Sequence, residues 1–206
     1  MAENVGLQIK RRGVPLNHVR ENCMGDGLAQ ACNFSVDRRY RYALRHTWEP
    51  LLRPKFCTWV GLNPSIADEH QLDPTLRRIR AFSAAWGYNG FIVTNLFALV
   101  STDPNRLYTA PDPVGRENDF FISKAAQEST EIIAAWGALG GFQNRCQVVL
   151  AILADSTVMC LKETKEGYPS HPLYVAGSTT PKRYRGVPKD LTEQMKPATN
   201  KLDNGF

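Results

Sequence analysis

The stretch Phe56-Cys57-Thr58-Trp59-Val60-Gly61-Leu62-Asn63-Pro64-Ser65 decides the fold that the sequence predicts. Its apolar first half is typical of a buried strand, and its polar second half is typical of a turn. Open α/β sheets build their active sites at the carboxyl ends of their strands. The pattern therefore predicts that the carboxamide of Asn63 lies at that edge of a sheet.

The next segments complete a β-α-β unit. Leu76, Ile79 and Phe82 recur at helical spacing, and Asp73 followed by a proline is typical of a helix start. This predicts a helix over 74–86, and the apolar run 90–97 predicts a second strand, which carries Asn95. Strands joined through a helix are parallel neighbours, so Asn63 and Asn95 are expected at the same edge.

The rest of the chain continues the α/β pattern. Aromatic and apolar residues alternate with arginines over 34–46, which predicts an antiparallel pair of strands with a basic face. Further strands are expected over 131–137 and 158–161, and helices over 115–129 and 145–153. We therefore predict an α/β fold, a three-layer α/β/α sandwich with a central parallel sheet of about four strands and N-terminal antiparallel strands.

Length and composition indicate one domain. The 206 residues, 43% of them hydrophobic, suffice for one substantial core. We expect an N-terminal extension over 1–33, loosely ordered, then a single domain over 34–190 and a C-terminal tail over 191–206. The net charge of +5 favours a polyanion such as nucleic acid as partner.

The cysteines and the hydropathy indicate the cellular environment that the sequence predicts for the protein. The five cysteines are odd in number and widely spread, which favours reduced thiols and a cytoplasmic location. They lack the spacing of a zinc or iron–sulfur site, so neither a metal nor another cofactor is expected. No apolar run approaches 18 residues, which argues against a membrane protein. We expect a monomer.

Two motifs carry a family resemblance that spans roughly residues 56–174. Gly61-Leu62-Asn63-Pro64-Ser65 resembles the Gly-x-Asn-Pro-Gly motif of the mismatch-specific branch of the uracil-DNA glycosylase superfamily. His171-Pro172-Leu173-Tyr174 is similar to that branch's His-Pro-Ser-Pro motif, and Val93-Thr94-Asn95-Leu96 with Asp103-Pro104-Asn105-Arg106 is similar to segments of the thermophilic branch. The chain also resembles the uncharacterised family DUF1643.

Departures from those motifs limit what the resemblance implies. Ser65 stands where the branch has glycine, and the second motif lacks its Ser-Pro. The aspartate-bearing motif of the main uracil-excising family and the cluster-binding cysteines of the thermophilic branch are absent. The resemblance therefore implies neither uracil specificity nor an iron–sulfur cluster.

The resemblance implies that Asn63 positions the attacking water, that His171 steadies charge on the departing base, and that Asn95 reads the base. The chemistry agrees, because breaking an N-glycosidic bond develops positive charge on the sugar and negative charge on the base. Such a site needs a positioned water, a donor to the base, and a pocket that excludes solvent. Asp68 is a rival to Asn63, and either Asp68 or Asp73 is a candidate general base.

A glycosylase must flip the base out of the duplex and hold it. Trp59, Phe97 or Trp136 is expected to stack on the base, with Ser65 in the base pocket, and Leu173 and Tyr174 are expected to fill the gap in the duplex. Phosphates are expected to bind a set of basic side chains: Arg77, Arg78, Lys182, Arg183 and Arg185.

The sequence thus predicts a monofunctional DNA glycosylase that removes a modified base, in particular a modified pyrimidine in phage DNA as antiviral defence. Two alternatives remain open. One is a hydrolase or transferase of free nucleosides or nucleotides, and the other is a catalytically silent DNA-binding module. Structural roles also compete at single residues, because Asn63-Pro64 is ordinary turn chemistry and a tryptophan usually belongs to a core.

Overall fold

The computed structural model describes residues 18–25, 28–49, 54–65 and 72–187. The strands are β1 (His18–Gly25), β2 (Leu28–Ser35), β3 (Arg41–Thr47), β4 (Phe56–Gly61), β5 (Gly90–Asn95), β6 (Glu131–Ala134), β7 (Val158–Cys160) and β8 (Lys182–Arg183). The helices are α1 (Pro74–Ala85), α2 (Arg106–Thr109), α3 (Asn118–Gln127) and α4 (Arg145–Ile152), with 3-10 turns η1 (Ala138–Asn144) and η2 (Pro172–Tyr174).

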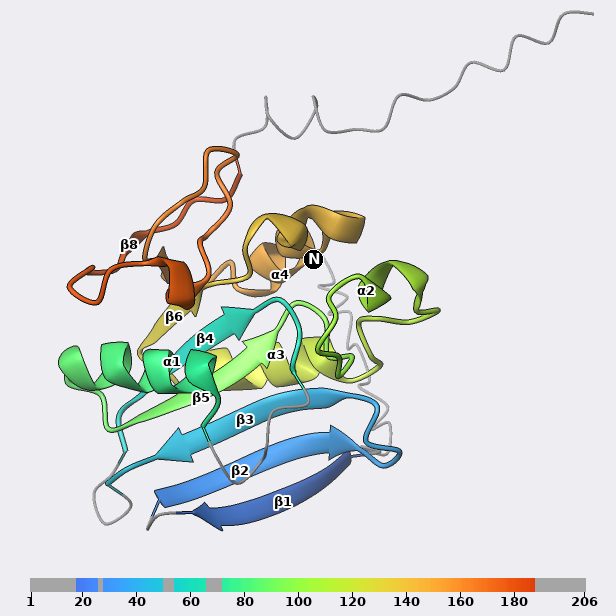
Figure 1. Cartoon of the computed structure of the whole chain (residues 1–206), viewed down its shortest axis with the longest axis horizontal. Coiled ribbons are helices and arrows are strands. Elements are labelled where there is room, and N and C mark those ends of the chain that lie inside the picture. Colours follow the sequence, from blue (N-terminus) through green and yellow to red (C-terminus); the bar gives the residue numbers. More distant parts are fainter. Residues whose placement is uncertain (1–17, 26–27, 50–53, 66–71, 188–206) are drawn as a thin grey trace, which may run out of the picture.

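One sheet of eight strands runs through the molecule in the order β1-β2-β3-β5-β4-β6-β7-β8 (Figure 1). The strands β5, β4, β6 and β7 are mutually parallel. The hairpin strands β1 and β2 with β3 extend one side antiparallel, and β8 adds an antiparallel strand at the other side. The α/β class is therefore confirmed, and the sheet is larger than the sequence predicts.

Successive side chains of the parallel strands point to opposite faces of the sheet, and on each face they pack against helices. Trp59, Phe91 and Val93 pack with Ile79 and Phe82 of α1 on one face. Val60 and Ile132 point to the opposite face, where they join a second cluster with the buried residues of α3 and α4, namely Ile122, Cys146 and Val149. Because apolar side chains occupy both of these faces, the parallel strands are buried on both sides.

Strand β4 is the point at which the order of the parallel strands reverses. From β4 the chain passes through α1 to β5 on one side, and it later enters β6 on the other side of β4. In open α/β sheets such a reversal leaves a crevice outside the carboxyl ends of the strands. The residues after β4 are therefore placed at the position where this architecture binds ligands.

The helix start at Asp73 is confirmed. Oδ1 of Asp73 accepts a hydrogen bond from the backbone N–H of Leu76 at 2.7 Å, and Pro74 occupies the first helical position. Helix α1 ends at Ala85, one residue before the predicted end. The predicted strands over 90–97 and 131–137 are likewise present, each ending earlier than predicted, and the apolar half of the stretch 56–65 forms β4.

Two expectations for the N-terminal part are wrong. Strands β1 and β2 occupy 18–25 and 28–35, where a loosely ordered extension is predicted over 1–33. Residues 1–17 of that extension and the predicted tail over 191–206 lie outside the described residues. The antiparallel pair around a turn at 36–39 exists as β2 and β3, but β3 has no exposed basic face. Arg41 is buried and Arg45 is half-buried, because β3 lies inside the sheet between β2 and β5.

The described cysteine side chains, Cys32, Cys57, Cys146 and Cys160, are all buried in the core. Burial raises the pKa of Cys57 and of Cys160 to about 11, so both thiols are protonated at neutral pH. In the described part of the chain, no helix has the length and apolar content needed to cross a bilayer.

We expect Ser83→Ala to lower the free energy of unfolding by about 1–3 kcal/mol. Oγ of Ser83 accepts hydrogen bonds from Nε1 of Trp59 at 3.1 Å and from Sγ of Cys57 at 3.2 Å, and the substitution leaves that indole N–H without a partner in the core. Urea unfolding measures the change. Ser123→Ala, on the half-exposed side of α3, is the control, and an equally small effect for both variants would contradict the prediction.

Candidate active site at the carboxyl edge of the parallel strands

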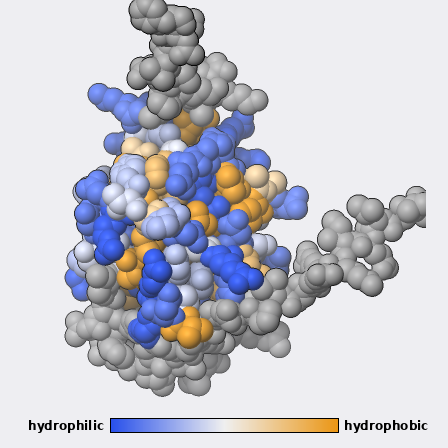
Figure 2. Space-filling model, turned by 90° about the vertical axis from the view of Figure 1, so that its right-hand side faces the viewer, coloured by the Kyte–Doolittle hydropathy of each residue, from blue (hydrophilic) through white to orange (hydrophobic). Residues whose placement is uncertain are grey.

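A cavity of about 500 Å³ opens at the carboxyl ends of β4, β5 and β6. Its volume is in the range of small-molecule and nucleotide pockets. Figure 2 shows the molecule from the side to which these strand ends point in Figure 1, and apolar residues lie there among hydrophilic ones. The polar and aromatic residues of the lining include Arg41, Asn63, Ser65, Asp73, Asn95, Ser101, Trp136, His171 and Tyr174.

The carboxamide of Asn63 is held in one orientation. Its Nδ2 donates to the backbone carbonyl of Ser101 at 2.8 Å and to that of Pro64 at 3.2 Å. The carbonyl Oδ1 forms no hydrogen bond with the described residues and is left as an acceptor at the cavity. An acceptor fixed in this way can orient a water molecule without a proton transfer.

Asn95 lies at the end of β5, beside the end of β4. Asn95 is 5% exposed, and its side chain makes no hydrogen bond with the described part of the chain. Its backbone carbonyl, in contrast, accepts a hydrogen bond from Nδ2 of Asn118 at 2.9 Å. The carboxamide thus offers an unused donor and an unused acceptor to a ligand in the cavity, as the edge of a nucleobase requires.

Gly61 makes room for Asn95. A Cβ atom at Gly61 would lie 2.7 Å from Oδ1 of Asn95. We expect Gly61→Ala to displace the Asn95 carboxamide and to lower the rate of the reaction proposed below at least about tenfold, since ångström-scale misplacement has large effects on rate. Single-turnover kinetics measure it. Ser123→Ala, on α3 and outside the cavity lining, is the control, and equal rates for both variants would contradict the prediction.

His171 precedes η2 and faces the same cavity. Its Nδ1 accepts a long hydrogen bond, 3.4 Å, from the backbone N–H of Leu173, which leaves Nε2 as the N–H donor of the neutral ring. Burial lowers the pKa of His171, and the negative charge of Asp73 opposes that shift without cancelling it. The ring is therefore neutral at pH 7 and can donate one hydrogen bond from Nε2.

Asp73 links the N-terminus of α1 to the turn that follows β4. While Oδ1 caps α1, Oδ2 accepts a hydrogen bond from Oγ of Ser65 at 3.2 Å. The aspartate, the serine and His171 all belong to the cavity lining. The cavity thus combines two carboxamides, a neutral imidazole and a carboxylate.

The sequence profile of DUF1643, described as a protein of unknown function, matches residues 41–173, more than half of the chain. The chain belongs to the DUF1643 family. The matched range contains β3 through the start of η2, and hence Asn63, Asn95 and His171. No curated protein and no solved structure matches the chain significantly. DUF1643 itself assigns no activity to the cavity.

In this DUF1643 protein the aromatic candidates lie deeper than the sequence predicts. Trp59 is fully buried, stacks on Trp86 with ring centroids 5.7 Å apart, and only borders the cavity. Phe97 is also fully buried, packs against Phe142, and lies outside the lining. Trp59 of β4 belongs to the core cluster under α1, and Phe97, two residues beyond the end of β5, belongs to the core cluster with α3 and α4. Trp136 is 2% exposed and lines the cavity.

The rim contains exposed side chains. Leu173 is 43% exposed, and Tyr174 is 83% exposed and lies with its ring 5.7 Å from that of His171. An exposed leucine and tyrosine beside the cavity have the chemistry required of a wedge that enters a duplex. Asp68, the rival water-activating residue, lies outside the described residues.

Three of the predicted phosphate-binding residues, Arg77, Arg78 and Lys182, have partners within the protein. Nη2 of Arg78 donates to the backbone carbonyl of Val175 at 2.5 Å and thereby ties α1 to the segment after η2. Nη1 of Arg77 donates to the carbonyl of Leu72, and Lys182 pairs with Glu163 at 2.7 Å. Arg183 and Arg185 are exposed at and beyond β8. Arg78 therefore has a structural role beside the cavity.

Arg41 is a charged lining residue that sequence reasoning missed. It is 6% exposed, although the alternation over 34–46 predicts an exposed basic face. Its backbone N–H donates to the carbonyl of Ala98, which follows β5. Arg41 could have been identified from its position in a strand inside the sheet. That position follows only once the pairing of β3 with β5 is known.

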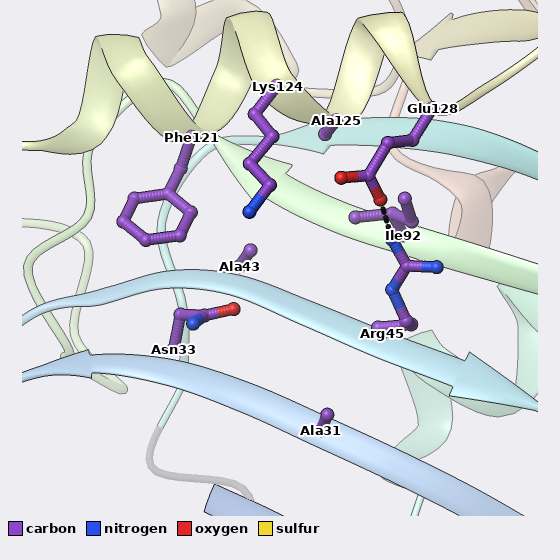
Figure 3. A pocket seen from close by; sticks show the side chains of 9 residues that line it. All are labelled: Ala31, Asn33, Ala43, Arg45, Ile92, Phe121, Lys124, Ala125 and Glu128. Atoms are coloured by element: carbon purple, nitrogen blue, oxygen red, sulfur yellow. Dashed lines mark ion pairs between the residues drawn. The ribbon is translucent and has the colours of Figure 1, made fainter. Parts of the chain in front are cut away.

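A second cavity of about 500 Å³ lies under α3 (Figure 3). Three alanines, Ala31, Ala43 and Ala125, leave the space between the sheet and the helix. The ion pair of Arg45 with Glu128 lies at one end, and the Lys124 side chain points into the space from α3 (Figure 3). The carboxyl-edge cavity remains the candidate active site, because it alone of the two gathers imidazole, carboxamide and carboxylate groups.

Proposed function

We propose that this DUF1643 protein is a monofunctional DNA glycosylase that hydrolyses the N-glycosidic bond of a modified base and leaves an abasic site. The proposal includes a three-layer α/β/α fold of the uracil-DNA glycosylase type, with helices on both faces of the parallel strands. One observation carries it: Asn63, Asn95 and His171, which lie far apart in the sequence, line one cavity at the carboxyl edge.

Each group has a role in the reaction. The C1′–N bond breaks and the base takes both electrons, while a water oxygen forms the new bond to C1′ and the water's proton ends on the base. Oδ1 of Asn63 orients that water, and Nε2–H of His171 donates to the base oxygen on which negative charge develops. Asn95 holds the base edge, and Leu173 with Tyr174 fills the space that the flipped nucleotide leaves.

The substrate that we propose is a modified pyrimidine, such as hydroxymethylated or glucosylated cytosine in phage DNA. The first motif departs from the uracil-reading ones at Ser65, which lines the cavity together with Asn95. The cavity volume of about 500 Å³ leaves room for a substituent on the base. Removal of such bases makes the protein an antiviral defence factor.

The test is mass spectrometry of the bases released from a panel of DNAs. The panel contains uracil, oxidised, alkylated, hydroxymethylated-cytosine and glucosylated-cytosine DNA, each as single strand and as duplex. Release of one modified base as the free base, with an abasic site left behind, supports the proposal. Release from no DNA by folded protein contradicts it. Cleavage of free nucleosides alone favours the nucleoside hydrolase, and DNA binding without any cleavage favours the silent binding module.

A further inference from the structure

Asp73 is the one carboxylate that lines the carboxyl-edge cavity among the described residues. Both of its oxygens have fixed partners, the backbone N–H of Leu76 for Oδ1 and the hydroxyl of Ser65 for Oδ2. It also acts on His171, whose pKa its negative charge raises against the effect of burial. The negative charge is therefore held at a set place, beside the imidazole that faces the ligand.

From this geometry we infer that Asp73 is a catalytic residue whose fixed negative charge stabilises the positive charge that develops on the sugar during cleavage. The inference rests on the proposed function, because the positive charge arises from breaking an N-glycosidic bond. It assigns to the site a substrate whose reacting carbon becomes cationic. A transferred phosphoryl group, which carries negative charge, is repelled by the same carboxylate.

The contacts of Asp73 favour a role through charge over a role as general base. The N–H at the start of α1 and the Ser65 hydroxyl both direct hydrogen toward the carboxylate, and a helix N-terminus favours negative charge. Asp73 is therefore assigned a role through its charge, and no proton passes through it in the reaction that we propose. The water's proton goes to the departing base, as in the reaction above. Asn63 orients the water, so that the two residues have separate roles.

Asp73→Asn is the sharpest variant. Asparagine is as good an N-cap as aspartate, so α1 keeps its start, and its carboxamide oxygen can still accept from Leu76 or Ser65. The variant thus removes the charge and leaves the shape. Asp155→Asn, an exposed aspartate beyond α4 that is outside the cavity lining, is the matched control for loss of one negative charge.

The probes are two duplexes with a stable abasic analogue, one carrying a cationic pyrrolidine and the other a neutral tetrahydrofuran. The cationic ring imitates the charged sugar of the transition state. We expect the native protein and Asp155→Asn to bind the pyrrolidine duplex at least about tenfold more tightly than the tetrahydrofuran duplex. We expect Asp73→Asn to bind both with similar affinity, and to lose base release while its thermal unfolding stays close to that of the native protein.

The outcomes separate the two proposals. If the native protein releases a base and Asp73→Asn keeps both the release rate and the preference for the pyrrolidine duplex, the inference about Asp73 is overturned and the glycosylase proposal stands. If the native protein releases no base from any DNA, the glycosylase proposal fails. If the native protein releases a base but shows no preference for the cationic duplex, the charge-based role of Asp73 is excluded.

Discussion

Replacing Asn63 with alanine is expected to lower the single-turnover rate of base release about 10²–10³-fold. The substitution removes Oδ1, the acceptor that the hydrogen bond from Nδ2 to the Ser101 carbonyl fixes at the cavity. Water then enters the cavity without a preferred orientation toward the sugar. Affinity for uncleaved DNA is expected to change little, because the lost contact is to the water and not to the DNA.

Asn89→Ala is the matched control. Oδ1 of Asn89 accepts from the backbone N–H of Lys55 at 2.5 Å at the opposite end of β5, so this variant also loses a hydrogen bond between a carboxamide and the backbone. Both variants are expected to lose about 1 kcal/mol of stability. Only Asn63→Ala is expected to lose activity. A rate within threefold of the native protein would show that Asn63 acts only as a turn residue.

His46 is expected to make the fold sensitive to acid. The residue is 2% exposed, and neither ring nitrogen has a hydrogen-bond partner among the residues that the structure describes. Burial, with a smaller contribution from the charge of Arg80, lowers its pKa to about 4. In the unfolded chain the pKa is about 6.5, so between these values the unfolded state binds a proton that the folded state does not. Stability therefore falls as the pH falls, by about 3 kcal/mol from this group between pH 7 and pH 4.

Urea unfolding of the native protein and of His46→Leu at pH 7 and pH 4 measures this effect. The variant is expected to lose about 3 kcal/mol less than the native protein over that range, because it lacks the group that takes up the proton. Phe91→Leu is the control, since its ring lies 5.1 Å from that of His46 and does not titrate. If the stability difference between His46→Leu and the native protein is the same at both pH values, the prediction fails.

The parallel half of the sheet could be predicted from the sequence, because its strands are continuous apolar runs and α1 has a cap and a regular apolar face. β1 and β2 could not. Their sequences, HVRENCMG and LAQACNFS, contain few β-branched or aromatic residues, and they become strands through pairing with each other and with β3. Such pairing is a long-range property that local propensity does not reveal.

The candidate site could be predicted in part. The placement of Asn63 and Asn95 follows from one rule, that the carboxyl ends of parallel strands lie at the same edge of a sheet. The placement of His171 is predicted from its motif alone. The structure places all three in one lining, while their catalytic roles remain predictions. The lining role of Arg41 depends on the order of the strands, and the burial of Phe97 depends on the helices that cover the sheet. Neither property is encoded in the local pattern.

The contact of Arg78 with the carbonyl of Val175 links two of the elements around the cavity. Helix α1, which begins after Asp73, is joined in this way to the segment that follows His171 and η2, while Asn63 and Asn95 belong to the strand ends. The strength of this link therefore sets how firmly the imidazole is held relative to the carboxylate of Asp73. A substitution that removes the guanidinium is expected to loosen His171 at the cavity and to leave both carboxamides in place.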